Sequence, residues 1–81
     1  MTKTVNTEQI AIIDIGSNSV RLVVMERDKN SLKTILNDKK ICELGDRDPE
    51  GNIKKKNKNK ALDALKEFQK YIDKHKIEHV V

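Results

Sequence analysis

The sequence predicts a small α/β fold with three antiparallel strands, one crossover helix and the start of a fourth, parallel strand. Three observations support this fold class. Two β-branched, apolar stretches flank four turn-forming residues, a later stretch has apolar residues at helical spacing, and the last residues are apolar again. A strand, a helix and a further strand in this order form a crossover unit, whose two strands lie parallel in one sheet.

Length and composition limit the chain to one small domain with a thin core. It has 81 residues, of which 36% are hydrophobic and 37% charged, with one Phe, one Tyr and no Trp. A domain near this size buries only about 60–65% of the surface of its unfolded chain. No apolar run reaches the ~18 residues of a membrane helix, so we expect no membrane partner. The opening residues lack a secretory pattern and Cys42 is the only cysteine, which together predict a cytoplasmic protein.

The first predicted strand is the apolar run Ile10–Ile15, in which Asp14 is the only charged residue. A short continuous run of this kind is typical of a strand that is buried on both faces. We expect residues 1–8 before it to form a flexible N-terminal segment, because they are polar. The four residues at 16–19 all favour turns, and the β-branched residues 20–25 then complete a hairpin.

The third predicted strand is more polar and covers residues 32–42, after a second turn at 28–31. Its polar pair Asn37–Asp38 predicts a bulge or a bend within the strand. A loop follows at 44–52, because this stretch contains a proline and a glycine.

A helix is expected after this loop, because apolar residues spaced four, three and four apart form one stripe. The lysines at 54–56 make its start weak, since the helix dipole favours acidic residues there. The stripe consists of Ala61, Leu65, Phe68 and Ile72, with Leu62 and Ala64 beside it.

The last predicted strand, Ile77–Val81, lies parallel to another strand of the same sheet. A buried parallel strand needs cover on both faces. Nothing after Val81 supplies this cover, so we expect the chain to be the front part of a longer protein.

The turn at 16–19 is where we expect a ligand. A carboxylate in a buried strand, such as Asp14, is costly unless it is paired, hydrogen-bonded or bound to a metal. Successive N–H groups in a turn form an anion-binding nest, and a carboxylate beside a phosphate suits a hard cation such as Mg²⁺. On composition alone, an ordinary β-turn in which Asp14 caps its own backbone remains the simpler interpretation.

The segment IAIIDIGSNSVRLVVME, residues 10–26, closely resembles the first phosphate motif of the exopolyphosphatase / guanosine pentaphosphate phosphohydrolase (Ppx/GppA) family. LGDRDPEGNI resembles the loop before the family's first helix, and ALDALKEFQKYIDKHKIEHVV resembles that helix and the next strand. The resemblance implies the actin, Hsp70 and sugar-kinase superfamily. It also implies a ribonuclease-H-like lobe, of which residues 9–81 would be the N-terminal part.

The resemblance also implies the roles of single residues. Asp14 corresponds to the acid that helps to position Mg²⁺ or another divalent cation, and Arg21 supports the phosphate loop. The loop that cradles the phosphate chain corresponds to Gly16, Ser17, Asn18 and Ser19.

The implied substrates are inorganic polyphosphate or guanosine penta- or tetraphosphate, hydrolysed by a homodimeric parent protein. In the family, the general base and the second phosphate motif lie downstream of this region. Phosphoanhydride cleavage needs water, metal and phosphate placed together. We therefore expect the chain to be inactive without the rest of the parent polypeptide.

Some positions depart from the family pattern. Glu43 stands where relatives often carry a basic or neutral residue, and Lys76 where a glycine often ends the helix. Lys54 and Lys58 stand where a helix cap and an apolar residue are common.

The lysine-rich run KKKNKNK, residues 54–60, leaves an alternative function open, a non-catalytic polyanion-binding module. With two aromatic residues in the chain, base stacking is poorly supported, so we do not expect nucleic acid as a partner. A solvated helix start is the simpler interpretation of this run. The hydrolase hypothesis needs a divalent cation and residues 14–19, whereas the module needs only lysines and low salt.

Overall fold

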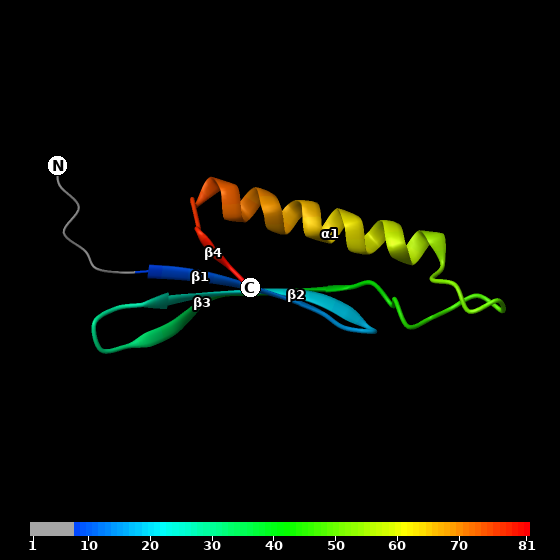
Figure 1. The fold of residues 1–81 in the computed structure, drawn as a ribbon, viewed down its shortest axis with the longest axis horizontal. Coiled ribbons are helices and arrows are strands. Elements are labelled where there is room, and N and C mark those ends of the chain that lie inside the picture. The colour runs from blue at the N-terminus through cyan, green and yellow to red at the C-terminus, as the bar shows by residue number, and fades with distance from the viewer. Residues whose placement is uncertain (1–7) are drawn as a thin grey trace.

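The computed structural model describes residues 8–81, which form one four-stranded sheet with a helix across one face (Figure 1). The strand order is β3-β2-β1-β4, and β4 is parallel to β1 while the other pairs are antiparallel. The predicted fold class is therefore confirmed. The elements are β1 (Glu8–Ile15), β2 (Ser19–Arg27), β3 (Leu32–Ile41), α1 (Lys55–Lys74) and β4 (His79–Val80).

The hairpin of β1 and β2 follows the prediction closely. The strands pair from Glu8 with Arg27 to Ile15 with Val20, and β2 starts at Ser19, the last residue of the predicted turn. Glu8 already belongs to β1, so the predicted flexible segment is wrong at that residue. The other seven residues of that segment lie outside the described part of the chain.

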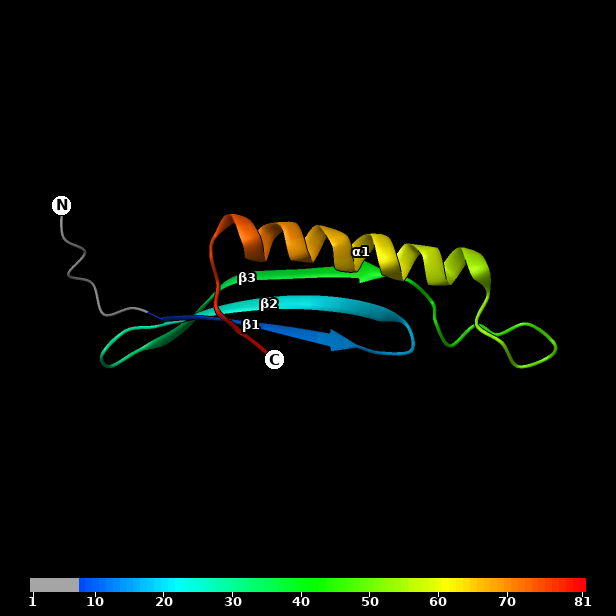
Figure 2. The same ribbon diagram turned by 45° about the horizontal axis from the view of Figure 1, so that its top comes forward.

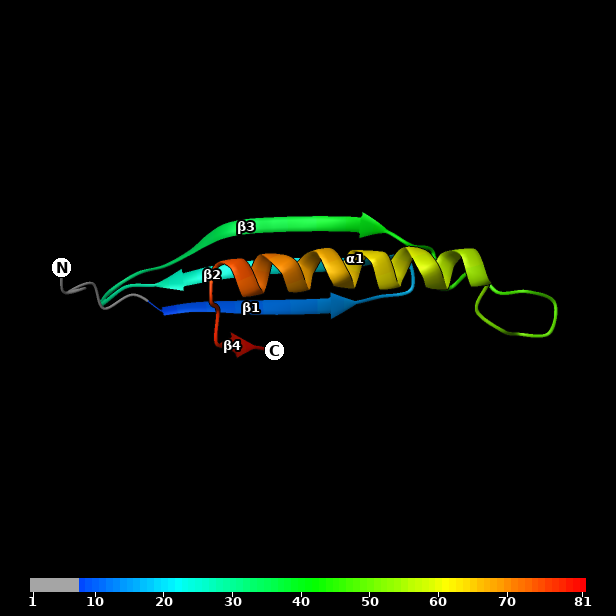
Figure 3. The same cartoon turned by 90° about the horizontal axis from the view of Figure 1, so that it is seen from above.

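The core lies between the sheet and α1, which runs along β2 when the molecule is seen from above (Figure 3). Side chains alternate between the faces of a strand, so cross-strand partners such as Ala11 and Val24 share the helix side. The buried residues are Ala11, Val20, Leu22, Val24, Cys42, Ala61, Ala64, Phe68, Ile72 and Ile77. Cys42 is therefore a small core residue with a free thiol.

The opposite face of the sheet is open within residues 8–81, as Figure 2 shows for the single helix layer. In β1 only Ala11 is buried, Ile10 and Ile12 are half-buried, and Asp14 and Ile15 are exposed. The expectation of a strand buried on both faces is therefore wrong for this chain, because one helix covers one face. No helix in this part of the chain is long and apolar enough to span a bilayer.

The bulge of β3 lies at Ile35, and the prediction of a bulge at Asn37–Asp38 is wrong. β3 is an edge strand of the sheet, so its polar residues meet solvent and continue the ladder without a break. One extra residue on one strand is what defines a bulge. The register pairs on either side of it are Val24–Leu36 and Met25–Thr34.

The buried stripe of α1 begins one turn earlier than predicted, at Asn57. Leu65 is half-buried beside the stripe, and Leu62 is 45% exposed. The sequence did not predict a buried Asn57, because a polar residue in a lysine-rich stretch is usually exposed to solvent. The buried residues of α1 are Asn57, Ala61, Ala64, Phe68 and Ile72.

The C-terminus of α1 ends in a Schellman-type cap with a lysine in the position usual for glycine. Lys76 has a φ of 53°, in the left-handed region. The Ile77 N–H donates to the Ile72 carbonyl at 3.1 Å, and the Lys76 N–H donates to the Asp73 carbonyl at 3.2 Å. This is the hydrogen-bond pattern of the motif, and Ile72 and Ile77 are both buried in the core, as the motif's hydrophobic positions usually are.

The last strand is shorter than predicted, because Ile77 belongs to the cap and the core. Its ladder continues past β4, since the Val81 N–H donates to the Ala11 carbonyl at 2.8 Å. The Ile13 N–H in turn donates to the Val81 carbonyl at 2.9 Å. The parallel direction of this strand was predicted correctly.

We predict that Lys76→Gly raises the free energy of unfolding by about 1 kcal/mol, because glycine adopts the left-handed conformation without a Cβ clash. Urea denaturation measures this change. The matched control is Lys70→Gly on the exposed side of α1, which should lower the free energy of unfolding by about 1 kcal/mol. A loss of stability in Lys76→Gly would contradict the cap.

Candidate functional site

The turn between β1 and β2 lies at the end of the sheet where α1 begins (Figure 2). Asp14 and residues 16–18 are exposed there, and Ser19 is half-buried. The structure thus brings the predicted site residues together at one open edge. The argument from a buried Asp14 is wrong, because the carboxylate lies at the open end of β1.

A second segment, Cys42–Gly45, is hydrogen-bonded to the backbone of this turn, and we call it the support segment. The Asn18 carbonyl accepts hydrogen bonds from the N–H groups of Cys42 and Glu43, both at 2.9 Å. The Ser17 carbonyl accepts one from the Gly45 N–H at 2.7 Å. The two carbonyl groups of the turn are therefore fixed toward the support segment.

The N–H groups of the same two turn residues are available to a ligand. Among residues 8–81, no hydrogen-bond acceptor is found for the N–H of Ser17 or of Asn18. The turn itself is closed by the Gly16 N–H, which donates to the Ser19 carbonyl at 2.9 Å. Adjacent N–H groups without acceptors in a turn attract an anion.

Gly45 makes the close approach between turn and support segment possible. A Cβ atom at this position would lie 3.1 Å from Ser17 Cβ and 3.3 Å from Ser17 O. At Gly16 the same atom would lie 3.5 Å from Ser19 O, an ordinary contact, and the backbone there does not have positive φ. A Cβ at 45 would therefore oblige Ser17 to shift by a few tenths of an ångström, whereas a Cβ at 16 would fit without a shift. The role of Gly45 could not be predicted from the sequence, because its contact Ser17 lies 28 residues earlier.

The guanidinium of Arg21 points toward β3 and not toward the turn. Arg21 pairs in register with Asp14, but its Nη1 donates to Asn37 Oδ1 at 2.6 Å. Both Asp14 and Arg21 therefore occupy the same end of the open face, without an ion pair between them in the described part of the chain.

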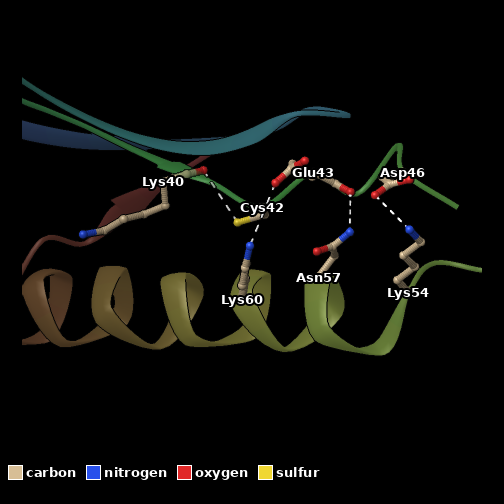
Figure 4. A network of polar contacts seen from close by, with 7 residues as sticks. All are labelled: Lys40, Cys42, Glu43, Asp46, Lys54, Asn57 and Lys60. Atoms are coloured by element: carbon tan, nitrogen blue, oxygen red, sulfur yellow. Dashed lines mark hydrogen bonds and ion pairs between the residues drawn. The ribbon is translucent and has the colours of Figure 1, made fainter.

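The first turns of α1 are fastened to the support segment and the loop after it (Figure 4). Asn57 is 1% exposed, and its Nδ2 donates to the Glu43 carbonyl at 3.0 Å. Lys60 lies 3.9 Å from the Glu43 carboxylate, and Lys54 lies 3.1 Å from that of Asp46. The helix has neither a side-chain cap nor an acidic residue in its first turn, so these contacts hold its start.

Three lysines of the run at 54–60 have no ion-pair partner within residues 8–81, namely Lys55, Lys56 and Lys58. All three are exposed. The other two, Lys54 and Lys60, are engaged with acidic residues of the loop. The lysine cluster therefore divides into residues that fasten the helix and residues that face solvent.

Asp14 is the carboxylate that precedes the turn by two residues in the sequence. No group of three or more His, Cys, Asp and Glu side chains in residues 8–81 could hold a metal ion by itself. Mg²⁺ usually takes one or two carboxylates together with substrate phosphates and waters. One exposed carboxylate near two turn N–H groups that have no acceptor within residues 8–81 is compatible with that chemistry.

The architecture and the edge on which the turn lies define the class of protein. A β-hairpin, an edge strand and a helix that leads to a parallel strand match the N-terminal lobe of an actin-like fold in part. In fold and in sequence, the chain is similar to the N-terminal part of structures of the Ppx/GppA family.

The comparison with solved structures supports this assignment. Over 91% of its length the chain matches the Aquifex aeolicus Ppx/GppA family member, with 35% identity and a TM-score of 0.85. A second structure of the A. aeolicus PPX-GPPA enzyme matches over 91% with 37% identity and a TM-score of 0.84. An exopolyphosphatase from Cytophaga hutchinsonii matches over 91% with 29% identity and a TM-score of 0.77.

The chain spans about a quarter of the length of these structures, since it covers 24%, 25% and 24% of them. No family model matches the sequence, and no curated protein matches it.

We predict that Gly45→Ala lowers the free energy of unfolding by about 1–3 kcal/mol, because the new Cβ would push Ser17 away from the support segment. Thermal or urea denaturation measures this loss. Gly16→Ala is the control, and it should raise the free energy of unfolding by about 0.5 kcal/mol, because alanine fits its backbone without strain. Equal effects of the two variants would contradict the close approach at Gly45.

Proposed function

We propose that the chain carries the first phosphate-binding loop of a Ppx/GppA-type hydrolase that releases phosphate from inorganic polyphosphate or from guanosine penta- or tetraphosphate. The observation that carries the proposal is the exposed turn, whose Ser17 and Asn18 N–H groups have no acceptor within residues 8–81. Phosphate oxygens are strong acceptors, so these two N–H groups suit them. The match to an exopolyphosphatase supports this class of substrate.

The residues of the turn would share the work of binding. The backbone N–H groups would hold phosphate oxygens, and the hydroxyls of Ser17 and Ser19 and the amide of Asn18 add donors beside them. Asp14 would hold Mg²⁺ or another divalent cation, which when bound neutralises charge on the phosphate oxygens. Arg21 would add positive charge at the same end of the open face.

Gly16 leaves room for the ligand. The fold tolerates a Cβ at this position, so the conformation of the turn does not need a glycine here. The absence of a side chain would instead leave the backbone of the turn accessible to a ligand. A phosphate chain could then approach the backbone closely.

An amide NMR titration of the chain with inorganic polyphosphate tests the proposal. We expect the amides of residues 16–19 to shift, and to shift further when Mg²⁺ is present. The second candidate function, plain polyanion attraction, is favoured by the exposed, unpaired Lys55, Lys56 and Lys58. If only the amides near 54–60 shift and salt abolishes the effect, the phosphate-loop proposal is wrong and that second function stands.

We predict that Gly16→Ala weakens polyphosphate binding about tenfold, the equivalent of roughly one charge-assisted hydrogen bond, without loss of stability. The same titration gives the affinity, and urea denaturation gives the stability. Wild-type affinity in this variant would mean that the ligand does not approach the backbone at Gly16.

We also predict that the purified chain binds polyphosphate without hydrolysing it. The turn supplies binding groups, and the general base that the family resemblance implies lies outside the matched segment. Phosphate release with Mg²⁺ should equal that of buffer alone. A rate that depends on both Mg²⁺ and the chain would refute this prediction.

A further inference from the structure

We propose that Asn57 is a positioning residue for the phosphate loop, through which the first turn of α1 fixes the conformation of the β1–β2 turn. The proposal rests on the proposed function of that turn. The sequence comparison with the phosphate motif does not include Asn57, which lies 38 residues beyond Ser19 along the chain.

Two hydrogen-bonded steps connect Asn57 to the turn. The Asn57 Nδ2 donates to the Glu43 carbonyl at 3.0 Å, and the Glu43 N–H donates to the Asn18 carbonyl at 2.9 Å. Two residues further on, the Gly45 N–H donates to the Ser17 carbonyl at 2.7 Å. Asn57 therefore holds Glu43, which makes one contact to the turn itself and lies two residues before Gly45, which makes the other.

Glu43, the residue that Asn57 holds, has an unusual backbone conformation. Its φ of 56° lies in the left-handed region, which is unfavourable for a residue with a Cβ. Such a conformation persists only where its surroundings determine it. The left-handed φ of Glu43 sets the direction of the chain after it, which includes the Glu43 carbonyl and Gly45. That carbonyl accepts hydrogen bonds from the Asp46 N–H within the same loop and from the amide of Asn57, both at 3.0 Å, and only the second bond joins it to α1.

Stability alone does not explain an asparagine at this position. Asn57 is buried, and its Oδ1 has no hydrogen-bond partner among residues 8–81. Because an unsatisfied buried oxygen is unfavourable, an apolar residue of similar size would cost the fold little. What the apolar residue would lose is the bond to the Glu43 carbonyl, whose effect is local to the support segment.

The other contacts of the helix start cannot replace Asn57. The ion pairs of Lys60 with Glu43 and of Lys54 with Asp46 join side chains that are more than a third exposed. Exposed pairs of this kind contribute little and are screened by salt. They also hold side chains, whereas Asn57 holds the backbone of the support segment (Figure 4).

The test combines amide hydrogen exchange with polyphosphate titration of the chain. Asn57→Leu removes the donor and keeps a similar volume, and Asn57→Asp keeps the shape and, when ionised, removes the donor. In both variants we expect the exchange of the Glu43 and Gly45 amides to accelerate about tenfold more than that of the Leu22 and Val24 amides, which report global opening. The dissociation constant for polyphosphate, measured at the amides of 16–19, should rise at least about threefold.

The control variant is Ile72→Val, which trims the core at the other end of α1 without touching the support segment. It should leave polyphosphate affinity unchanged and should not change Gly45 exchange relative to that of Leu22. Uniform acceleration of exchange in the Asn57 variants would overturn the proposal, because it would indicate a merely structural role. Faster exchange at Gly45 with unchanged affinity would overturn it too.

The proposed function and the positioning role fail in different ways. If the wild-type chain shows no shifts at 16–19 with polyphosphate, the phosphate-binding function is refuted. The exchange measurement uses no ligand, so wild-type protection of Glu43 and Gly45 in both Asn57 variants would by itself refute the positioning role.

Discussion

The hydrogen bonds between the β1–β2 turn and the support segment are the interaction on which the rest of the site depends. The carbonyl groups of Ser17 and Asn18 accept hydrogen bonds from N–H groups of the support segment, so both carbonyls are oriented toward that segment. This leaves the N–H groups of the turn without acceptors within residues 8–81. The close approach that the bonds need is possible because Gly45 has no Cβ. A local turn thus acquires its orientation from a segment distant in sequence.

The one-sided core explains why this site lies open. A single helix covers one face of the sheet, so the apolar residues of β2 that face it are buried, whereas Asp14 at the end of β1 is exposed. Arg21 lies opposite Asp14 on the uncovered face. The charged groups of the motif are therefore accessible in this chain without a desolvation penalty. Which interactions these two side chains make therefore depends on the charges of the ligand that binds there.

The local elements could be predicted from the sequence, whereas the contacts that orient the turn could not. Apolar periodicity predicted the hairpin and α1, because side-chain spacing within an element is a local property. The bulge at Ile35 and the exposure of Asp14 depend on which strand is at the edge and which face is covered. Because Asn57 is a polar residue among lysines, its sequence context predicts a solvated side chain. Only its spacing of four residues from Ala61 indicates that it continues the buried stripe.

The start of α1 couples helix stability to the geometry of the site. Without a side-chain cap or a first-turn acid, the helix start depends on contacts with the loop before it. One of these contacts, the hydrogen bond from Asn57, holds the Glu43 carbonyl, and the Glu43 N–H donates to the turn. Fraying of the first helical turn would therefore loosen the support segment, and a bound phosphate that favours one orientation of the turn would in return favour the ordered helix start. By this reciprocity, the weak helix start and the β1–β2 turn would form one cooperative unit.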